Sequence, residues 1–154
     1  MRILYATDGS RGALDAAHLL ASLPLATEDQ LMVLAVVPEY EDAEGRAALA
    51  SAREALTHCT ANLTLHMRRG DPAEAILRVA EDQAADLIVV GSRGLSTVAR
   101  FFLGSVAERV ARHALCPVLL VRPRGLFLLG HHPLVLVVIV LVVVAVVVWQ
   151  QRRR

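Results

Sequence analysis

The stretch GSRGLSTVARFFLGS, residues 91–105, has the residue types of a loop that binds an anion. Gly91, Gly94 and Gly104 can bring backbone N–H groups close to a ligand, because glycine has no Cβ to stand in the way. Ser105 begins the pattern Ser-x-x-Glu, a capping box that predicts the start of a helix. Unpaired N–H groups and the positive end of the helix dipole at such a start favour phosphate. The stretch therefore predicts a phosphate-binding loop followed by a helix.

A second polar segment, ATDGS at residues 6–10, follows the first apolar run of the chain. The sequence contains no lysine and so excludes a P-loop, whose lysine reaches the phosphates. No nucleophile or general base stands beside the glycines, which favours a binding site over a catalytic one. Simpler interpretations stay open. Asp8 and Ser105 would then only cap helices, the glycines would only form turns, and Arg93 would be a solvated loop charge.

Apolar runs rich in β-branched residues alternate with segments of helical period along the first 122 residues. This alternation is typical of a parallel sheet flanked by helices. Right-handed crossovers then predict an α/β fold: a doubly wound, open, parallel five-stranded sheet of order 3-2-1-4-5 with helices on both faces. Ligands of such folds bind outside the carboxyl ends of the strands, here where strands 1 and 4 end. The predicted strands are 3–7, 31–37, 63–67, 87–90 and 118–121, and the predicted helices are about 13–23, 42–61, 72–84 and 105–114.

Composition limits the classes of function. All 15 acidic residues lie within residues 1–124, so the formal net charge of +1 hides a mildly acidic body and a small basic end. Neither part carries the basic patch of a nucleic-acid-binding protein, and no nucleic-acid partner is predicted. Cys59 and Cys116 lack CxxC spacing, and we expect both to be buried, reduced core residues of a cytosolic protein. The histidines show no metal-ligand spacing, so no protein metal site is predicted.

The pattern Gly91-x2-Gly94-x9-Gly104-Ser105 resembles the nucleotide-binding pattern of the ATP-binding branch of the universal stress protein family. The segment ATDGS, the turn GDPAE at residues 70–74 and the run GSVAERVARHALCPVLLVRP at residues 104–123 are also similar to that family's pattern. The resemblance extends over the first 123 residues. It implies an adenine nucleotide alpha hydrolase-like fold and an ATP-binding stress-response regulator that acts by nucleotide-dependent dimer or partner contacts. It further implies a homodimer formed through Val118–Val121.

The resemblance also implies a role for each matching residue. Asp8 would lie by the adenosine part of ATP, and Val36 would meet the adenine through its backbone. Mg²⁺ or Mn²⁺ would accompany the nucleotide. The second helix and the loop before it look short for the family, which leaves the outer wall of the adenine pocket undefined. The residues along the ribose and phosphates would be Gly91, Arg93 and Gly94, and those that hold the phosphate chain would be Gly104, Ser105 and Val106.

Two other functions stay open at this stage. An enzyme of the same fold would hydrolyse ATP slowly or transfer a nucleotidyl group, although the SGGxDS pattern of adenylating relatives is absent from the chain. A membrane-tethered interaction module would instead carry an idle nucleotide site. We expect a binding protein rather than an enzyme, because the residues between the glycines of the 91–105 stretch suit packing better than reaction.

The C-terminal part of the chain differs in kind. Residues 134–149, LVLVVIVLVVVAVVVW, form an unbroken apolar run. As a helix this run would measure about 24 Å, slightly less than the roughly 30 Å hydrocarbon core of a bilayer. Trp149 and the arginines at 152–154 suit an interface anchor. We therefore expect a hydrophobic, transmembrane helix that anchors a cytoplasmic domain to the inner face of the cytoplasmic membrane. A segment without a selected role and an extra buried or swapped strand are the alternatives. The predicted parts are a nucleotide-binding domain at 1–124, a linker at 125–133 and a hydrophobic tail with a basic end at 134–154.

Overall fold

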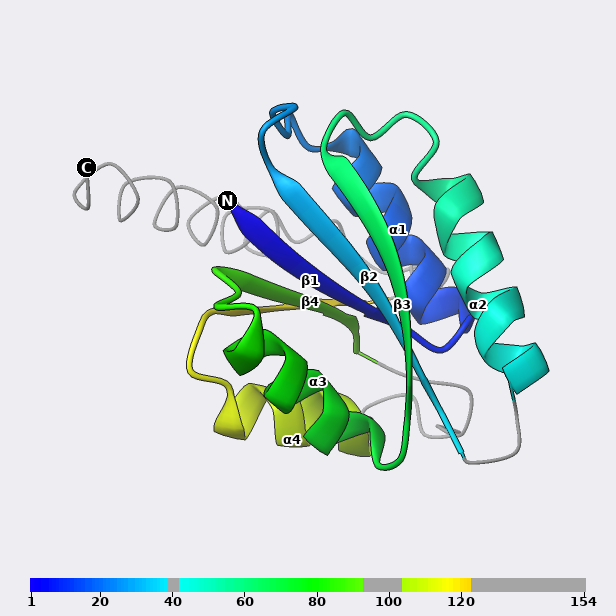
Figure 1. Ribbon diagram of the computed structural model, residues 1–154, viewed down its shortest axis with the longest axis vertical. Coiled ribbons are helices and arrows are strands. Elements are labelled where there is room, and N and C mark those ends of the chain that lie inside the picture. Colours follow the sequence, from blue (N-terminus) through cyan, green and yellow to red (C-terminus); the bar gives the residue numbers. More distant parts are fainter. Residues whose placement is uncertain (39–41, 93–103, 123–154) are drawn as a thin grey trace, which may run out of the picture. The chain divides into compact units, whose positions relative to one another are not determined.

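A computed structural model of the chain describes residues 1–38, 42–92 and 104–122, in which strands and helices alternate strictly (Figure 1). By their contacts, the residues divide into the units Met1–Pro123 and Arg124–Arg154, and every described element belongs to the first. In chain order the elements are β1 (Arg2–Thr7), α1 (Arg11–Ser22), β2 (Gln30–Val37), α2 (Asp42–Ala55), β3 (Asn62–Arg69), α3 (Pro72–Asp82), β4 (Leu87–Gly91), α4 (Ser105–His113) and β5 (Val118–Val121).

The five strands are parallel and lie in the order β3-β2-β1-β4-β5, which confirms the predicted topology. In the central strand β1, Ile3 lies opposite Leu31 of β2 and Leu87 of β4. The chain leaves β1 toward α1 on one face, whereas it enters α4 on the other face after β4 (Figure 1). The carboxyl ends of β1 and β4 therefore border a crevice at the point where the strand order reverses.

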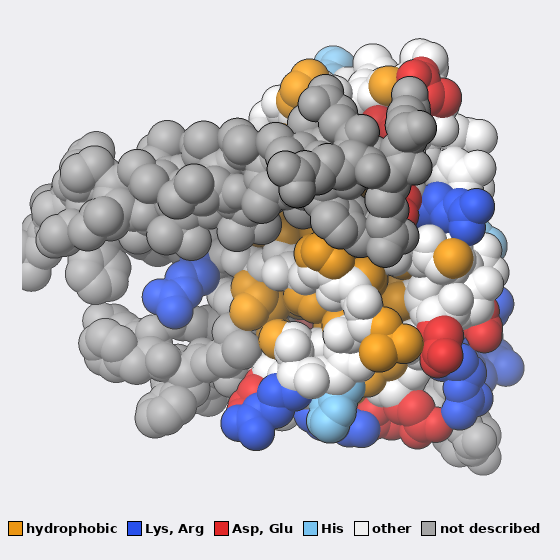
Figure 2. Space-filling model, turned by 90° about the vertical axis from the view of Figure 1, so that its left-hand side faces the viewer, with side chains coloured by type: hydrophobic (Ala, Val, Ile, Leu, Met, Phe, Trp, Pro, Cys, Tyr) orange, Lys and Arg blue, Asp and Glu red, His pale blue; other side chains and the backbone are white. Residues whose placement is uncertain are grey.

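The side chains of the central strands alternate between two hydrophobic layers. Ile3 and Tyr5 of β1 pack in the layer formed with α1 and α2, whereas Leu4 and Ala6 pack in the layer formed with α3 and α4. All four side chains are buried. Charged side chains of both signs lie at the surface, as Figure 2 shows for one face of the molecule. Burial on both faces explains why the central strands appear in the sequence as continuous apolar runs.

The starts of the helices correct part of the sequence analysis. Asp71 caps α3 as predicted, because its Oδ1 accepts a hydrogen bond from the Glu74 N–H at 2.8 Å. Ser105, predicted to cap the last helix, is instead the first residue of α4, and Gly104 occupies the cap position without a side-chain hydrogen bond. Ser10, not Asp8, caps α1. A four-residue pattern cannot fix the register of a helix start when glycine and serine, both accepted at the cap, stand side by side.

Two element boundaries also differ from the prediction. α2 ends at Ala55, six residues before the predicted end, because the Thr57 hydroxyl donates to the Glu54 C=O at 2.6 Å and the chain turns toward β3. β3 runs from Asn62 to Arg69, beyond the predicted 63–67, since its pairing with β2 continues to the pair Val37 and Arg69. β3 lies at the edge of the sheet, where polar side chains are tolerated and the apolar pattern underestimates the strand.

Two further predictions concerned the cysteines and a membrane-spanning helix. Cys59 and Cys116 are half-buried free cysteines that pack against the two hydrophobic layers, so the expectation of full burial was wrong. The described part of the chain contains no helix that is both long and apolar enough to cross a membrane. The predicted linker and hydrophobic tail, residues 125–154, lie outside the described residues, and the membrane anchor stays a prediction.

Candidate functional site

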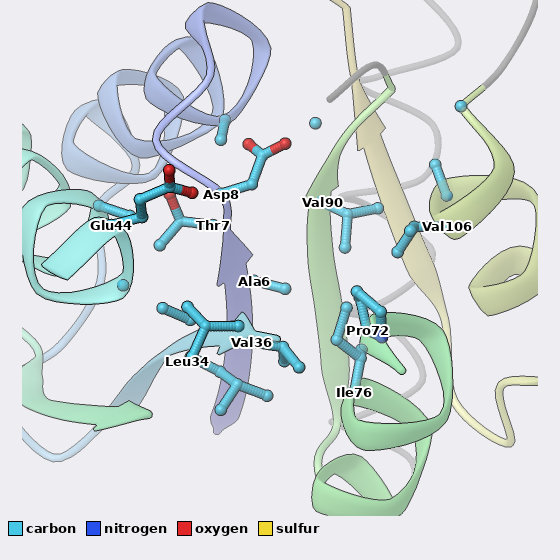
Figure 3. Close-up of a pocket in the computed structure, with 18 of the residues that line it drawn as sticks. Ala6, Thr7, Asp8, Leu34, Val36, Glu44, Pro72, Ile76, Val90 and Val106 are labelled. Carbon is cyan, nitrogen blue, oxygen red and sulfur yellow. The ribbon is translucent and has the colours of Figure 1, made fainter. Parts of the chain in front are cut away.

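A pocket of about 420 Å³ opens at the carboxyl ends of β1, β2 and β4 (Figure 3). The first turns of α2, α3 and α4 complete its walls. Of the residues predicted from the sequence, six line this pocket and two lie outside the described residues. The six are Asp8, Val36, Gly91, Gly104, Ser105 and Val106, and the other two are Arg93 and Gly94.

The turn between β1 and α1 hydrogen-bonds to itself. The Asp8 Oδ1 accepts from the Ser10 N–H at 3.0 Å, and the Ser10 Oγ accepts from the Ala13 N–H at 3.3 Å. The Thr7 Oγ1 accepts from the Gly9 N–H at 3.2 Å. Gly9 has a φ of 74°, in the left-handed region that glycine enters without strain. These bonds occupy N–H groups at the start of α1 that would otherwise be available to a ligand.

Residues of β1 and β4 also hold the first turn of α1 in place. Burial raises the pKa of Tyr5 to about 12, so its phenol stays protonated and donates to the Ala13 C=O at 2.6 Å. Gly91, at the end of β4, lies against the same turn. A Cβ at Gly91 would stand 2.7 Å from the Gly12 carbonyl carbon and 2.8 Å from the Ala13 N. Close packing of β4 against α1 therefore requires glycine here, in addition to any contact with a ligand.

We call the start of α1 closed, because side chains of the preceding turn accept hydrogen bonds from its N–H groups, and the start of α4 open, because its cap residue forms no side-chain hydrogen bond. Its cap residue, Gly104, has no side chain, and Ser105 is exposed at the first helical position. The Gly104 N–H donates to the C=O of the buried Ser92 at 2.8 Å, and the Ser92 N–H donates to the Val121 C=O at 2.7 Å. These two bonds attach α4 to the ends of β4 and β5. The first turn thus presents to the pocket the N–H groups that a helix leaves without an intrahelical partner.

Val36 lies where the backbone of β2 is open. β1 ends at Thr7, which pairs with Ala35, whereas β2 continues to Val37 and pairs there only with β3. Within the described sheet, the edge of β2 that faces β1 therefore has no strand partner at Val36. A planar group with donors and acceptors on its edge can bind such a free strand edge as a neighbouring strand would.

The outer wall of the pocket comes from the first turns of α2, which the sequence analysis left undefined. Glu44, Gly45 and Ala48 line the pocket. A Cβ at Gly45 would stand 2.6 Å from the Met67 Sδ and 2.7 Å from the Val37 Cγ1, so glycine lets this turn pack directly on the sheet. In the sequence, Gly45 only made the start of the helix ambiguous. The signal in the sequence that could have predicted this wall was a glycine next to a glutamate in the first turn of a helix.

The inner wall is apolar. Pro72 and Ile76 of α3 face Leu34 and Val36 of β2 across the pocket (Figure 3). Ile76 was predicted to face the sheet, and its place in the pocket was missed because the amphipathic pattern of a helix does not separate core contacts from cavity lining. An apolar slot beside a free strand edge suits a flat heterocycle.

Two ion pairs hold the helices that form the walls. The Arg69 guanidinium binds both carboxylate oxygens of Asp42 at 2.7 and 2.9 Å and so joins β3 to the first turn of α2. The Arg109 guanidinium binds both oxygens of Asp71 at 3.0 and 2.9 Å and joins α4 to α3. The Glu74 N–H, followed by Arg109, holds the pKa of Asp71 below its ordinary value. Both pairs are exposed, so each contributes modestly to stability and more to the position of a wall.

The charge of the lining is negative on one side. Among the described lining residues the ionisable side chains are Asp8 and Glu44, and neither lysine nor arginine lines the pocket. Figure 3 shows Glu44 on the side of α2 and Asp8 at the end of β1, and both lie across the pocket from Val106 at the start of α4. The pocket therefore has hydrogen-bond acceptors at one end and a helix N-terminus at the other, with the apolar slot beside them.

Comparisons of the sequence with known proteins point to one family. The sequence model of the universal stress protein family matches residues 1–122. Universal stress protein YxiE of Bacillus subtilis is 34% identical over 79% of this chain and 98% of its own length. Universal stress protein MJ0531 of Methanocaldococcus jannaschii is 32% identical over 79% of this chain and 81% of its own length. A local match to a universal stress protein of Thermus aquaticus reaches 57% identity but spans 35% of this chain and 39% of that protein.

Solved structures share the fold. The hypothetical protein MJ0577 superposes with a TM-score of 0.72 at 26% identity, over 81% of this chain and 97% of its own. A universal stress protein in complex with cAMP superposes with a TM-score of 0.67 at 31% identity, over 80% of this chain and 97% of its own.

Proposed function

Because this chain belongs to the universal stress protein family, we propose that it binds ATP in the pocket and acts as a stress-response regulator whose dimer or partner contacts depend on the nucleotide. One observation carries the proposal: a single pocket contains both the open start of α4 and the open edge of β2. The first suits phosphate and the second suits a base. The related universal stress protein in complex with cAMP supports an adenine nucleotide as the ligand.

The proposed pose follows from the lining. The adenine lies in the apolar slot against Val36, whose backbone forms the free strand edge, and Asp8 lies by the adenosine. The phosphates lie at the start of α4, against the backbone of Gly104 and Val106 and the hydroxyl of Ser105. Gly91, Arg93 and Gly94 would follow the ribose and phosphates.

The accompanying Mg²⁺ or Mn²⁺ is proposed to be held mainly by phosphate oxygens. Asp8 and Ser105 offer the oxygen atoms that such hard cations prefer. They do not amount to a protein cage, and the described residues include no group of three or more His, Cys, Asp or Glu side chains suited to a metal ion. The residues present thus fit an ion that arrives with the nucleotide and neutralises its charge.

The proposed dimer contact is the edge strand β5. Val118, Leu120 and Val121 are half-buried in the isolated chain, and Leu115, just before the strand, is 88% exposed. Edge strands with apolar side chains favour pairing with another copy.

The direct test is a titration of the full chain with ATP and Mg²⁺ by isothermal calorimetry, together with the Gly104→Val variant. We expect wild type to bind ATP with a Kd of about 1 mM or lower. The Kd of the variant should be at least about tenfold higher, because the branched valine side chain would cover the N–H groups at the start of α4. Absence of binding by wild type would overturn the proposal, and an idle site would then be the better interpretation. Equal binding by both proteins would overturn the assignment of the phosphates to α4.

We propose binding rather than catalysis because the described lining residues include no histidine or cysteine that could act as a general base or nucleophile. Slow ATP hydrolysis is the alternative. Release of phosphate above the uncatalysed rate, lost in Ser105→Ala, would favour that alternative.

A further inference from the structure

Glu44 is a carboxylate for which the nucleotide-binding pattern has no role. It belongs to the first turn of α2 and lines the pocket. Within the described residues it forms no hydrogen bond or ion pair, whereas Asp42, in the same turn, is bound to Arg69. We propose that Glu44 recognises the hydroxyl groups of the sugar of the bound nucleotide. This inference rests on the function proposed above and names a specificity-determining residue of the same site.

The position of the sugar follows from the two ends of the ligand. The phosphates lie at the start of α4 and the base lies against Val36, so the sugar that joins them crosses the carboxyl end of β1, at Thr7 and Asp8. Figure 3 shows the Glu44 carboxylate beside Thr7, at the carboxyl end of β1. Glu44 therefore borders the one part of the ligand that carries adjacent hydroxyl groups.

The chemistry of Glu44 suits this place. An ionised carboxylate only accepts hydrogen bonds, and its two oxygens can accept from two neighbouring hydroxyls at once. Asp8, directly after β1, already accepts a hydrogen bond from the Ser10 N–H through its Oδ1. Glu44 thus supplies acceptor oxygens that are not used to close a turn.

The backbone of Glu44 is held in place. The bidentate pair of Asp42 and Arg69 fixes the first turn of α2 to β3. Gly45 lets the same turn pack directly on Val37 and Met67. A side chain on a fixed turn loses less freedom when it binds, so it can discriminate between ligands that differ by one hydroxyl.

The test compares three ligands with three proteins. Full-length wild type, Glu44→Ala and Glu54→Ala are titrated with ATP, 2′-deoxy-ATP and 3′-deoxy-ATP, each with Mg²⁺. Glu54 is an exposed glutamate of the same helix that lies outside the nucleotide pocket. Wild type is expected to bind ATP about tenfold more tightly than at least one deoxy analogue, the lower range for a hydrogen bond to an exposed charged group.

In Glu44→Ala this preference is expected to vanish, with the affinity for the corresponding deoxy analogue unchanged, and Glu54→Ala is expected to keep it. Glu44→Gln retains one acceptor oxygen and is expected to keep part of the preference, which guards against a folding defect in the alanine variant. If Glu44→Ala weakens all three ligands equally, or none of them, the inference is wrong and the nucleotide site stands. If wild type binds none of the ligands, the proposed function and this inference are both wrong.

Discussion

The starts of α1 and α4 both border the same pocket, and they differ in how their N–H groups are used. At α1, Ser10 caps the helix and Asp8 closes the turn before it. At α4, Gly104 is the cap and contributes no side chain. Two helix starts on opposite faces of the sheet thus differ in one respect: side chains occupy N–H groups at the start of α1, whereas the cap residue of α4 has no side chain to do so.

This difference shows why a serine near a helix start has no fixed meaning. Ser10 precedes its helix and accepts the Ala13 N–H, whereas Ser105 has moved one position into its helix and is exposed. A shift of one residue converts a capping hydroxyl into one that a ligand can reach.

The largest expected effect concerns Gly91, which packs against the first turn of α1. Gly91→Ala should destabilise the protein by about 3 kcal/mol, because the added Cβ would overlap the backbone of Gly12 and Ala13 and push α1 away from β4. The measurement is chemical denaturation followed by circular dichroism. Gly70→Ala is the control: Gly70 has a φ of 118° but open space around it, so the control should lose only about 1 kcal/mol of stability to backbone strain. A smaller loss for Gly91→Ala than for Gly70→Ala would show that α1 adjusts easily.

The second prediction closes the open start. Gly104→Asp places a capping carboxylate at α4, so stability should change by only a few tenths of a kcal/mol while the Kd for ATP rises about a hundredfold. The carboxylate would take the N–H groups and repel the phosphates. Gly104→Asn is the matched variant, since asparagine caps equally well without charge. It should weaken ATP binding less than aspartate does, and equal losses would show that charge repulsion plays no part.

A third change opens the closed start. Ser10→Ala removes the acceptor of the Ala13 N–H and should lower the free energy of unfolding by about 1 kcal/mol. The Kd for ATP should change by less than about threefold, because Ser10 does not line the pocket. Thermal unfolding and calorimetry measure the two effects. A large loss of affinity with unchanged stability would reverse the roles assigned to the two helix starts.

The sequence predicted the five strands, their order and the edge of the sheet at which the pocket lies, because apolar runs and helical period depend on burial. The six pocket residues came from the resemblance to the universal stress protein family, whereas topology alone pointed to the ends of strands 1 and 4 and to the helix start that follows strand 4. The sequence analysis missed Glu44 and Ile76, which come from helices whose rotation about their axes depends on tertiary packing at Gly45 and along the sheet. It misplaced the cap at Ser105, because a difference of one residue at a helix start is decided by backbone contacts such as that of Gly104 with Ser92.

The smallest expected effect concerns a third helix start, capped by a charge instead of a hydroxyl. The Glu74 N–H and then Arg109 lower the pKa of Asp71 below its ordinary value of 3.8. A carboxylate with a lowered pKa in the folded protein stabilises it fully above the unfolded value, and this contribution is lost as the pH falls through the folded value.

Asp71→Asn keeps a good cap and removes the charge that binds Arg109, so at pH 7 it should cost less than about 1 kcal/mol, as expected for an exposed ion pair. The difference in unfolding free energy between wild type and variant should shrink toward zero below about pH 4. Urea denaturation at a series of pH values from about 3 to about 7, which spans the ordinary carboxylate pKa, measures this difference. A difference that stays constant over this range would mean that Asp71 acts through its cap geometry alone, in the manner of Ser10, and that charge adds nothing to a closed helix start.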